Sequence, residues 1–189
     1  MSTLPNPVAI SQVDREKLLV LLRDSRERFQ ASFAGVNDEE SRQRPAEGSW
    51  SVADCVEHVA AAETFMLRLL QGSRRPRPAG APNREELFLQ RMTDRSIHAT
   101  SPEGARPTGR FGSLEAAGKQ FEAARAETIR FVQETTDDLR ATEVTHPHPL
   151  FGNVSAYELV IIMARHAERH VLQIDEIKQS PAFLAVKKS

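Results

Sequence analysis

Apolar residues recur every three or four positions along four long segments of the chain, which is the spacing of one buried helix face. This spacing predicts long helices near residues 12–34, 51–71, 113–136 and 155–178, and a shorter helix near 84–96. Several of these segments begin with a capping side chain followed three residues later by a carboxylate. The pairs are Ser11 with Asp14, Ser51 with Asp54, Asn83 with Glu86, and Ser155 with Glu158.

No segment shows sustained strand alternation. Four long helices that each carry one apolar face predict an all-α fold, a four-helix bundle. The pattern indicates a single domain over residues 1–189, with its core at about 12–178 and loose tails at 1–10 and 180–189.

Residues 72–112 interrupt this scheme, because they hold five of the eleven prolines and five of the nine glycines. The bundle should therefore contain a long crossover connection between its second and third long helices. The arginines of this segment allow two interpretations, a solvated connection or a lid whose rim attracts anions. They are Arg74, Arg75, Arg77, Arg106 and Arg110.

Charge and composition exclude several classes of protein. The chain has 25 Lys and Arg against 26 Asp and Glu, a balance that argues against nucleic-acid binding. The longest apolar runs, Leu18–Leu22 and Leu159–Ala164, fall far short of the roughly 20 residues that span a bilayer. The single cysteine, Cys55, excludes an intrachain disulfide and lies on an apolar stripe, where a packed, inert thiol is expected. With no signal-peptide pattern at the start of the chain, we expect a cytoplasmic protein.

Three of the six histidines fall on apolar helix faces. His166 and His170 are four residues apart on the last long segment, so both imidazoles project from the same face, followed by Gln173. His58 falls at the edge of the apolar stripe of the second long segment. A single interior histidine is usually a hydrogen-bonded core residue, but histidines that converge from facing helices are how bundles build metal sites.

Three histidine ligands would leave a fourth coordination position open, as in catalytic metal sites, and imidazole suits zinc, nickel, copper or iron. The sequence HAERH departs from the HExxH of metalloproteases, because Glu168 falls on the outer helix face. His98 and His146 are expected in surface loops. His148 is a candidate fourth ligand or pocket residue, because its loop leads into the histidine helix.

Two stretches around these residues, GSWSVADCVEHV at 48–59 and HPLFGNVSAYELVIIMARHAERHVLQI at 148–174, resemble the DinB/YfiT-like superfamily, in particular its DinB_2-type members. PTGRFGS at 107–113 is similar to the entry of that group's third long helix. The resemblance covers about residues 12–178 and implies a four-helix bundle that holds a divalent metal through three histidines. Carried over to this chain, the ligands are His58, His166 and His170.

The resemblance also implies an activity, because characterised relatives include metal-dependent transferases and isomerases that use low-molecular-weight thiols such as mycothiol or bacillithiol. We therefore expect zinc or nickel, a small-molecule substrate or thiol, and thiol S-transferase-like chemistry. Arg110 could hold an anionic group, and Gln173 could hydrogen-bond a metal-bound water or a ligand histidine. Homodimerisation through a bundle face is a further expectation. The alternatives are a hydrolase that uses metal-bound hydroxide and a non-catalytic metal- or ligand-binding bundle of the stress response.

Overall fold

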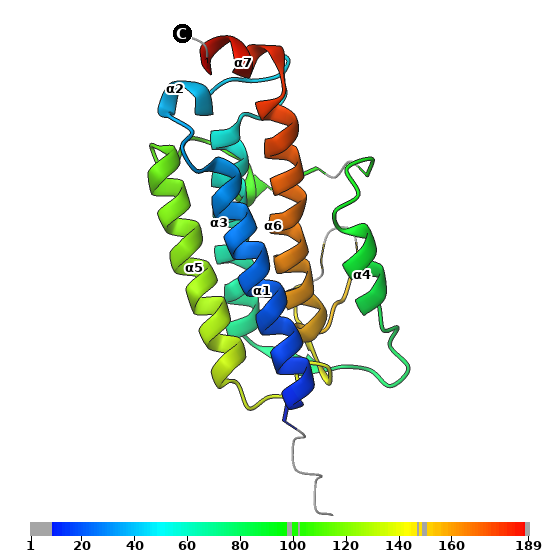
Figure 1. Ribbon diagram of the computed structural model, residues 1–189. Coiled ribbons are helices and arrows are strands. Elements are labelled where there is room, and N and C mark those ends of the chain that lie inside the picture. Colours follow the sequence, from blue (N-terminus) through cyan, green and yellow to red (C-terminus); the bar gives the residue numbers. More distant parts are fainter. Residues whose placement is uncertain (1–8, 98–99, 102, 147, 149–150, 188–189) are drawn as a thin grey trace, which may run out of the picture.

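A computed structural model describes residues 9–97, 100–101, 103–146, 148 and 151–187. Four long helices, α1, α3, α5 and α6, lie side by side and form the predicted four-helix bundle (Figure 1). Their bounds are Gln12–Phe33, Val52–Gln71, Leu114–Glu134 and Ala156–Lys178. The shorter elements are α2 (Asp38–Ser41), β1 (Arg74–Pro76), α4 (Glu85–Arg91), the 3₁₀ turn η1 (Glu103–Ala105), β2 (Thr142–Val144) and α7 (Pro181–Lys187).

The predicted caps explain where the long helices begin. The side chains of Ser11, Ser51 and Ser155 each accept a hydrogen bond from the backbone N–H three residues on, and the last two complete capping boxes with a carboxylate. The predicted cap at Asn83 is wrong by one residue, because Arg84 occupies the cap position of α4 without a side-chain hydrogen bond. The Asn83 side chain accepts instead from the N–H of Glu85, at 3.1 Å.

The bundle core is mainly apolar, and it contains a buried polar network around Arg125. The rings of Phe29 and Phe121 meet edge to face at 4.7 Å between centroids. Nearby, the fully buried Arg125 on α5 donates two hydrogen bonds to the carboxylate of Glu63 on α3, at 2.7 and 2.9 Å. It also donates to Ser25 Oγ on α1 and to the Met163 carbonyl on α6. Arg125 therefore joins all four long helices.

The helix α7 and a pair of short strands depart from the prediction. The loose tail expected at 180–189 contains α7, whose Phe183 is 2% exposed and packs in an apolar cluster with Phe29 and Ile177. Pro181 ends α6 but also begins α7, since proline fits the first turn of a helix. The strands β1 and β2 form a small antiparallel pair that was not expected, because three residues are too few to show alternation.

The crossover connection runs from the end of α3 to the start of α5, and it passes along α6, where α4 lies outside the bundle (Figure 1). The arginines at the start of the crossover form ion pairs with carboxylates of this chain and do not form an open rim. Arg74 pairs with Asp137, Arg75 with Glu143 and Arg77 with Glu158. Within the described part of the chain, no helix has the length and apolar character needed to cross a membrane.

Candidate metal centre

The three histidines on apolar faces come together between α3 and α6. The ring centroids of His58, His166 and His170 lie 4.7–5.0 Å apart. One nitrogen from each ring lies within 4.8 Å of the nitrogens from the other two rings. Among the described residues, this is the group of three or more His, Cys, Asp or Glu side chains close enough together to hold one ion. His58 and His170 are buried, and His166 is half-buried. The structure thus brings together the three residues that the sequence singled out.

Hydrogen bonds orient the ring of His58. Its Nδ1 lies 2.7 Å from the carbonyl oxygen of Ala105 and 3.3 Å from Oγ of Ser101, both in the crossover. A carbonyl can only accept, so the proton of the ring belongs on Nδ1 and the lone pair on Nε2. That Nε2 faces Nε2 of His166 at 3.1 Å, toward the centre of the cluster.

The donor set fits a divalent ion. His170 Nδ1 is buried and lacks a hydrogen-bond partner among the described residues, which is costly for a polar atom unless something else binds there. Imidazole nitrogens that face one another at 3.1 Å can share one proton or bind one ion. Three imidazoles with no carboxylate of the described chain joining them would suit zinc, nickel, copper or iron.

The electrostatics keep these rings neutral, which is the form that binds metals. Burial lowers the pKa of His166 and of His170 well below 6.5, and the neighbouring imidazoles lower both further. Burial also lowers the pKa of His58, although the hydrogen bond to the Ala105 carbonyl raises it, and the Arg110 guanidinium lowers it further. Protons therefore compete weakly for the nitrogens at neutral pH.

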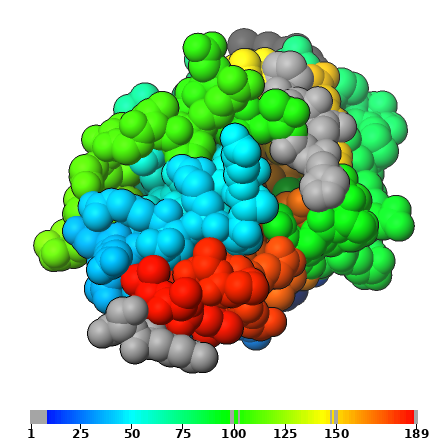
Figure 2. Space-filling view, turned by 90° about the horizontal axis from the view of Figure 1, so that it is seen from above, coloured from blue at the N-terminus to red at the C-terminus, as the bar shows by residue number. Residues whose placement is uncertain are grey.

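Trp50, one residue before the cap of α3, forms a wall of the site. Its ring lies 4.8 Å from that of His58 and stacks on that of His170 at 5.9 Å, with 15° between the planes. Trp50 is not among the site residues predicted from the sequence. The face seen in Figure 2 is hollowed between the cyan atoms around the start of α3 and the orange atoms of α6.

The other candidates lie around the cluster rather than in it. Gln173 Oε1 accepts from Arg95 Nη1 at 3.3 Å, so its amide joins α6 to the crossover. Arg110 donates to Glu57 and to the Gly104 carbonyl, which engages its guanidinium within the connection. His148 stacks on Phe151 at 4.8 Å and does not belong to the group of three. Burial lowers the pKa of His148 to about 4.

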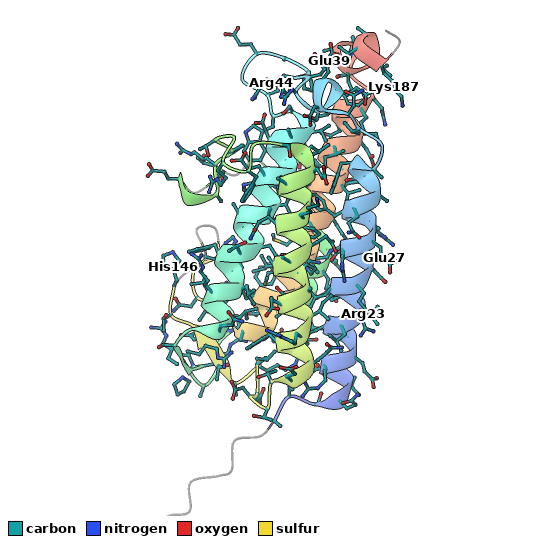
Figure 3. All side chains as sticks on the ribbon, turned by 90° about the vertical axis from the view of Figure 1, so that its left-hand side faces the viewer. Arg23, Glu27, Glu39, Arg44, His146 and Lys187 are labelled. Carbon is teal, nitrogen blue, oxygen red and sulfur yellow. The ribbon has the colours of Figure 1, made fainter. Side chains whose placement is uncertain are left out.

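The remaining candidates from the sequence are two histidines and the single cysteine. His146 is exposed and points to the outside of the molecule (Figure 3), as do Arg23 and Glu27 on α1. His98 lies outside the described residues. Cys55 is fully buried, and burial raises the pKa of its thiol, as expected of an inert packed cysteine.

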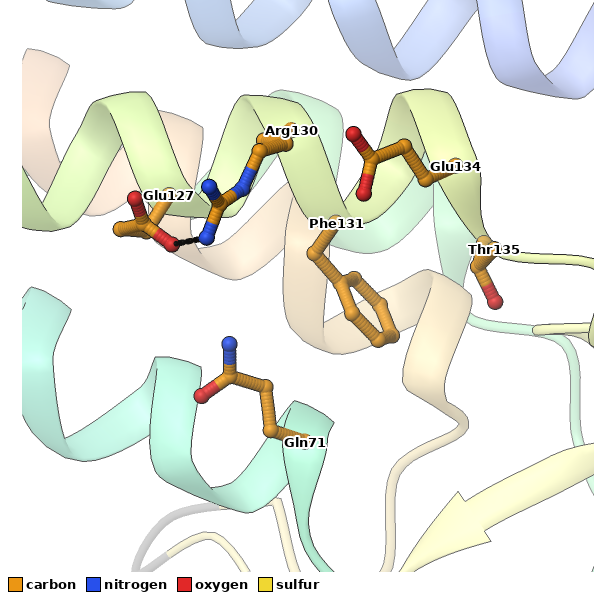
Figure 4. A pocket seen from close by; sticks show the side chains of 6 residues that line it. All are labelled: Gln71, Glu127, Arg130, Phe131, Glu134 and Thr135. Atoms are coloured by element: carbon orange, nitrogen blue, oxygen red, sulfur yellow. Dashed lines mark hydrogen bonds and ion pairs between the residues drawn. The ribbon is translucent and has the colours of Figure 1, made fainter.

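A separate surface hollow of about 250 Å³ lies between α3 and α5 (Figure 4). It is lined by Gln71, Glu127, Arg130, Phe131, Glu134 and Thr135. Arg130 pairs with Glu127 across its wall. The hollow contains none of the three clustered histidines, so its shape says nothing of their chemistry.

Comparison with known proteins agrees with the fold. Residues 21–174 match the sequence model of the DinB superfamily, and the chain belongs to this family. The uncharacterized protein YuaE of Bacillus subtilis is 23% identical over 145 residues, which is 77% of this chain and 87% of YuaE. The solved structure of YfiT from Bacillus subtilis shares the fold, with a TM-score of 0.52 and 16% identity over 95% of this chain and 94% of that one. YfiT is described as a probable metal-dependent hydrolase with an unusual four-helix bundle topology.

Proposed function

We propose that this protein is a divalent-metal-dependent enzyme that transfers a low-molecular-weight thiol to a small electrophilic substrate. The observation that carries the proposal is the cluster of His58, His166 and His170, whose nitrogens lie within 4.8 Å of one another. Zinc or nickel held there would act as a Lewis acid that lowers the pKa of a bound nucleophile.

The chain's own residues favour a thiol as that nucleophile. No carboxylate among the described residues joins the cluster, so none is placed as a general base for a water molecule. A thiol has an ordinary pKa near 8.5 and needs far less help to ionise at neutral pH than water does. Burial and the neighbouring imidazoles lower the pKa of His170, and the charges of Arg95 and Arg169 lower it further. The positive field of these two arginines favours an anionic nucleophile.

The surrounding residues orient the site and limit its contact with water. The Ala105 carbonyl holds the His58 ring, and the Trp50 ring covers His58 and His170 on one side. Arg169 donates to the carbonyls of Asp94 and Ile97, which fixes the middle of the crossover beside the histidine helix.

Hydrolysis is the second candidate, because YfiT, which shares the fold, is described as a probable metal-dependent hydrolase. Here the nucleophile would be water rather than a thiol. Both candidates need the same three histidines and differ in whether turnover requires a thiol.

The test measures turnover by protein loaded with zinc or with nickel. A chloronitrobenzene electrophile is supplied with mycothiol, with bacillithiol or without a thiol, and nitrophenyl esters and anilides are tested in parallel. We expect consumption of the electrophile that requires both metal and thiol and is lost in His166→Ala. Ester or anilide cleavage without thiol would replace the proposal with the hydrolase, and a metal-loaded protein inert toward all of these would favour a binding module.

A further inference from the structure

A buried carboxylate lies directly beside one of the clustered histidines. Glu57, the residue before His58 on α3, is 6% exposed, and its carboxylate faces the end of the crossover. It accepts hydrogen bonds from the backbone N–H groups of Thr108 at 2.6 Å, Gly109 at 2.8 Å and Arg110 at 3.4 Å. The Arg110 side chain donates a further bond from Nε, at 3.1 Å. One carboxylate thus fixes three successive residues of the connection.

The backbone of this turn depends on glycine. Gly109 has φ +77°, in the left-handed region where other residues are strained. This conformation allows neighbouring amides to converge on one anion, as in backbone anion nests. The turn and the Glu57 side chain are therefore complementary parts of one contact.

The same connection supplies the group that orients His58. The Ala105 carbonyl, at the end of η1, lies 2.7 Å from His58 Nδ1. Arg110 joins the two contacts, because its Nη1 donates to the Gly104 carbonyl at 2.8 Å and its Nη2 to the Arg106 carbonyl. The position of the Ala105 carbonyl is thereby tied to the Glu57 carboxylate.

We propose that Glu57 and the turn at 108–110 are a positioning device for the metal ligand His58. By holding the crossover against α3, Glu57 keeps the Ala105 carbonyl on Nδ1 and directs Nε2 into the cluster. Glu57 does not touch the ion or the substrate, and it acts only through the ring of His58. The proposal rests on the metal site of the proposed function. It adds Glu57, which is not itself a ligand, as the residue that positions one of the ligands.

The other end of the crossover offers a matched control. Glu158 on α6 is 1% exposed and accepts from the Arg84 N–H at 2.9 Å and from Arg77 Nη2 at 3.1 Å. It also accepts from the Ser155 N–H at 2.8 Å. Glu158 therefore anchors the crossover with two hydrogen bonds, yet it contacts none of the three clustered histidines in the described protein.

The experiment compares Glu57→Gln with Glu158→Gln. In each variant the amide NH₂ would face N–H donors that now face a carboxylate oxygen. Zinc affinity is measured in competition with a chelator, and the cobalt(II)-substituted protein gives an absorption spectrum that reports ligand geometry. Changes to groups that orient metal ligands typically cost about 10–100-fold in affinity. We expect that loss and an altered cobalt spectrum for Glu57→Gln, and both readouts unchanged for Glu158→Gln.

A second pair of variants changes the backbone of the turn that Glu57 binds. It can replace the first pair if a glutamine variant does not fold. Gly109→Ala and Gly80→Ala place the same strain on residues with φ +77°, but only Gly109 belongs to the turn that Glu57 binds. We expect weaker zinc binding for Gly109→Ala alone.

The outcomes separate this proposal from the proposed function. Equal zinc affinity for both glutamine variants, or for both alanine variants, would overturn the positioning role of Glu57. Failure of the wild-type protein to bind zinc, nickel or cobalt would instead overturn the metal site itself.

Discussion

Replacing Arg125 with methionine should lower the free energy of unfolding by about 3–5 kcal/mol, the usual cost of breaking a buried ion pair. Arg125 is fully buried and donates to both oxygens of Glu63, which is 1% exposed. It also donates to Ser25 Oγ and to the Leu22 and Met163 carbonyls, at 2.6, 3.0 and 3.2 Å. Methionine fills much of the volume but donates nothing to these groups.

Most of the expected loss comes from what the substitution leaves behind. In the variant, the Glu63 carboxylate keeps a hydrogen bond from the Thr128 hydroxyl among the described residues, and its charge is otherwise uncompensated. The double variant Arg125→Met/Glu63→Leu removes both charges, so it should regain a large part of the stability despite losing more hydrogen bonds. The recovery separates the cost of an unpaired charge from the loss of packing.

Equilibrium urea unfolding of metal-free protein, followed by circular dichroism, measures these differences. Arg130→Met is the matched control, because Arg130 forms an exposed pair with Glu127 and should change stability by less than about 0.5 kcal/mol. The reasoning is refuted if Arg125→Met costs no more than this control. It is equally refuted if the double variant is as unstable as the single one.

Two further predictions concern stability. Burial lowers the pKa of His148 to about 4, below the 6.5 of an unfolded histidine, so the unfolded chain binds more protons between these values. The free energy of unfolding should therefore fall as the pH drops from about 6.5 to about 4. In urea titrations, His148→Gln should make this decline with pH shallower, and a decline as steep as that of the wild-type protein would contradict the prediction. Phe183→Ala should cost about 3–5 kcal/mol, because Phe183 is 2% exposed, whereas the half-exposed Leu184→Ala should cost less than about 1 kcal/mol. Equal losses for the two would show that α7 contributes little to the fold.

The sequence predicted what depends on local periodicity. Apolar spacing and caps placed all four long helices within about two residues of their observed ends. The same projection selected His58, His166 and His170, because a polar residue on an apolar stripe must face the bundle interior. These inferences needed only the geometry of a single helix.

The rest depends on contacts between segments that are distant in sequence. No local sequence pattern shows that the Ala105 carbonyl contacts His58 Nδ1 or that Trp50 stacks on His170. The same is true of the ion pair between Arg125 and Glu63. Outside its short helix, the crossover has no hydrophobic period from which its path could be predicted, and its arginines allowed both a solvated connection and a lid whose rim attracts anions. Their carboxylate partners lie on other elements, which only the fold identifies.

The central claim is that the three histidines hold a divalent ion, and elemental analysis of the purified protein tests it most directly. We expect close to one zinc or nickel ion per wild-type chain, since three imidazoles form one site. His166→Ala should lose the ion, whereas His146→Ala, which removes an exposed histidine outside the cluster, should retain it. Unchanged metal content in His166→Ala, or a wild-type protein without metal, would contradict the account.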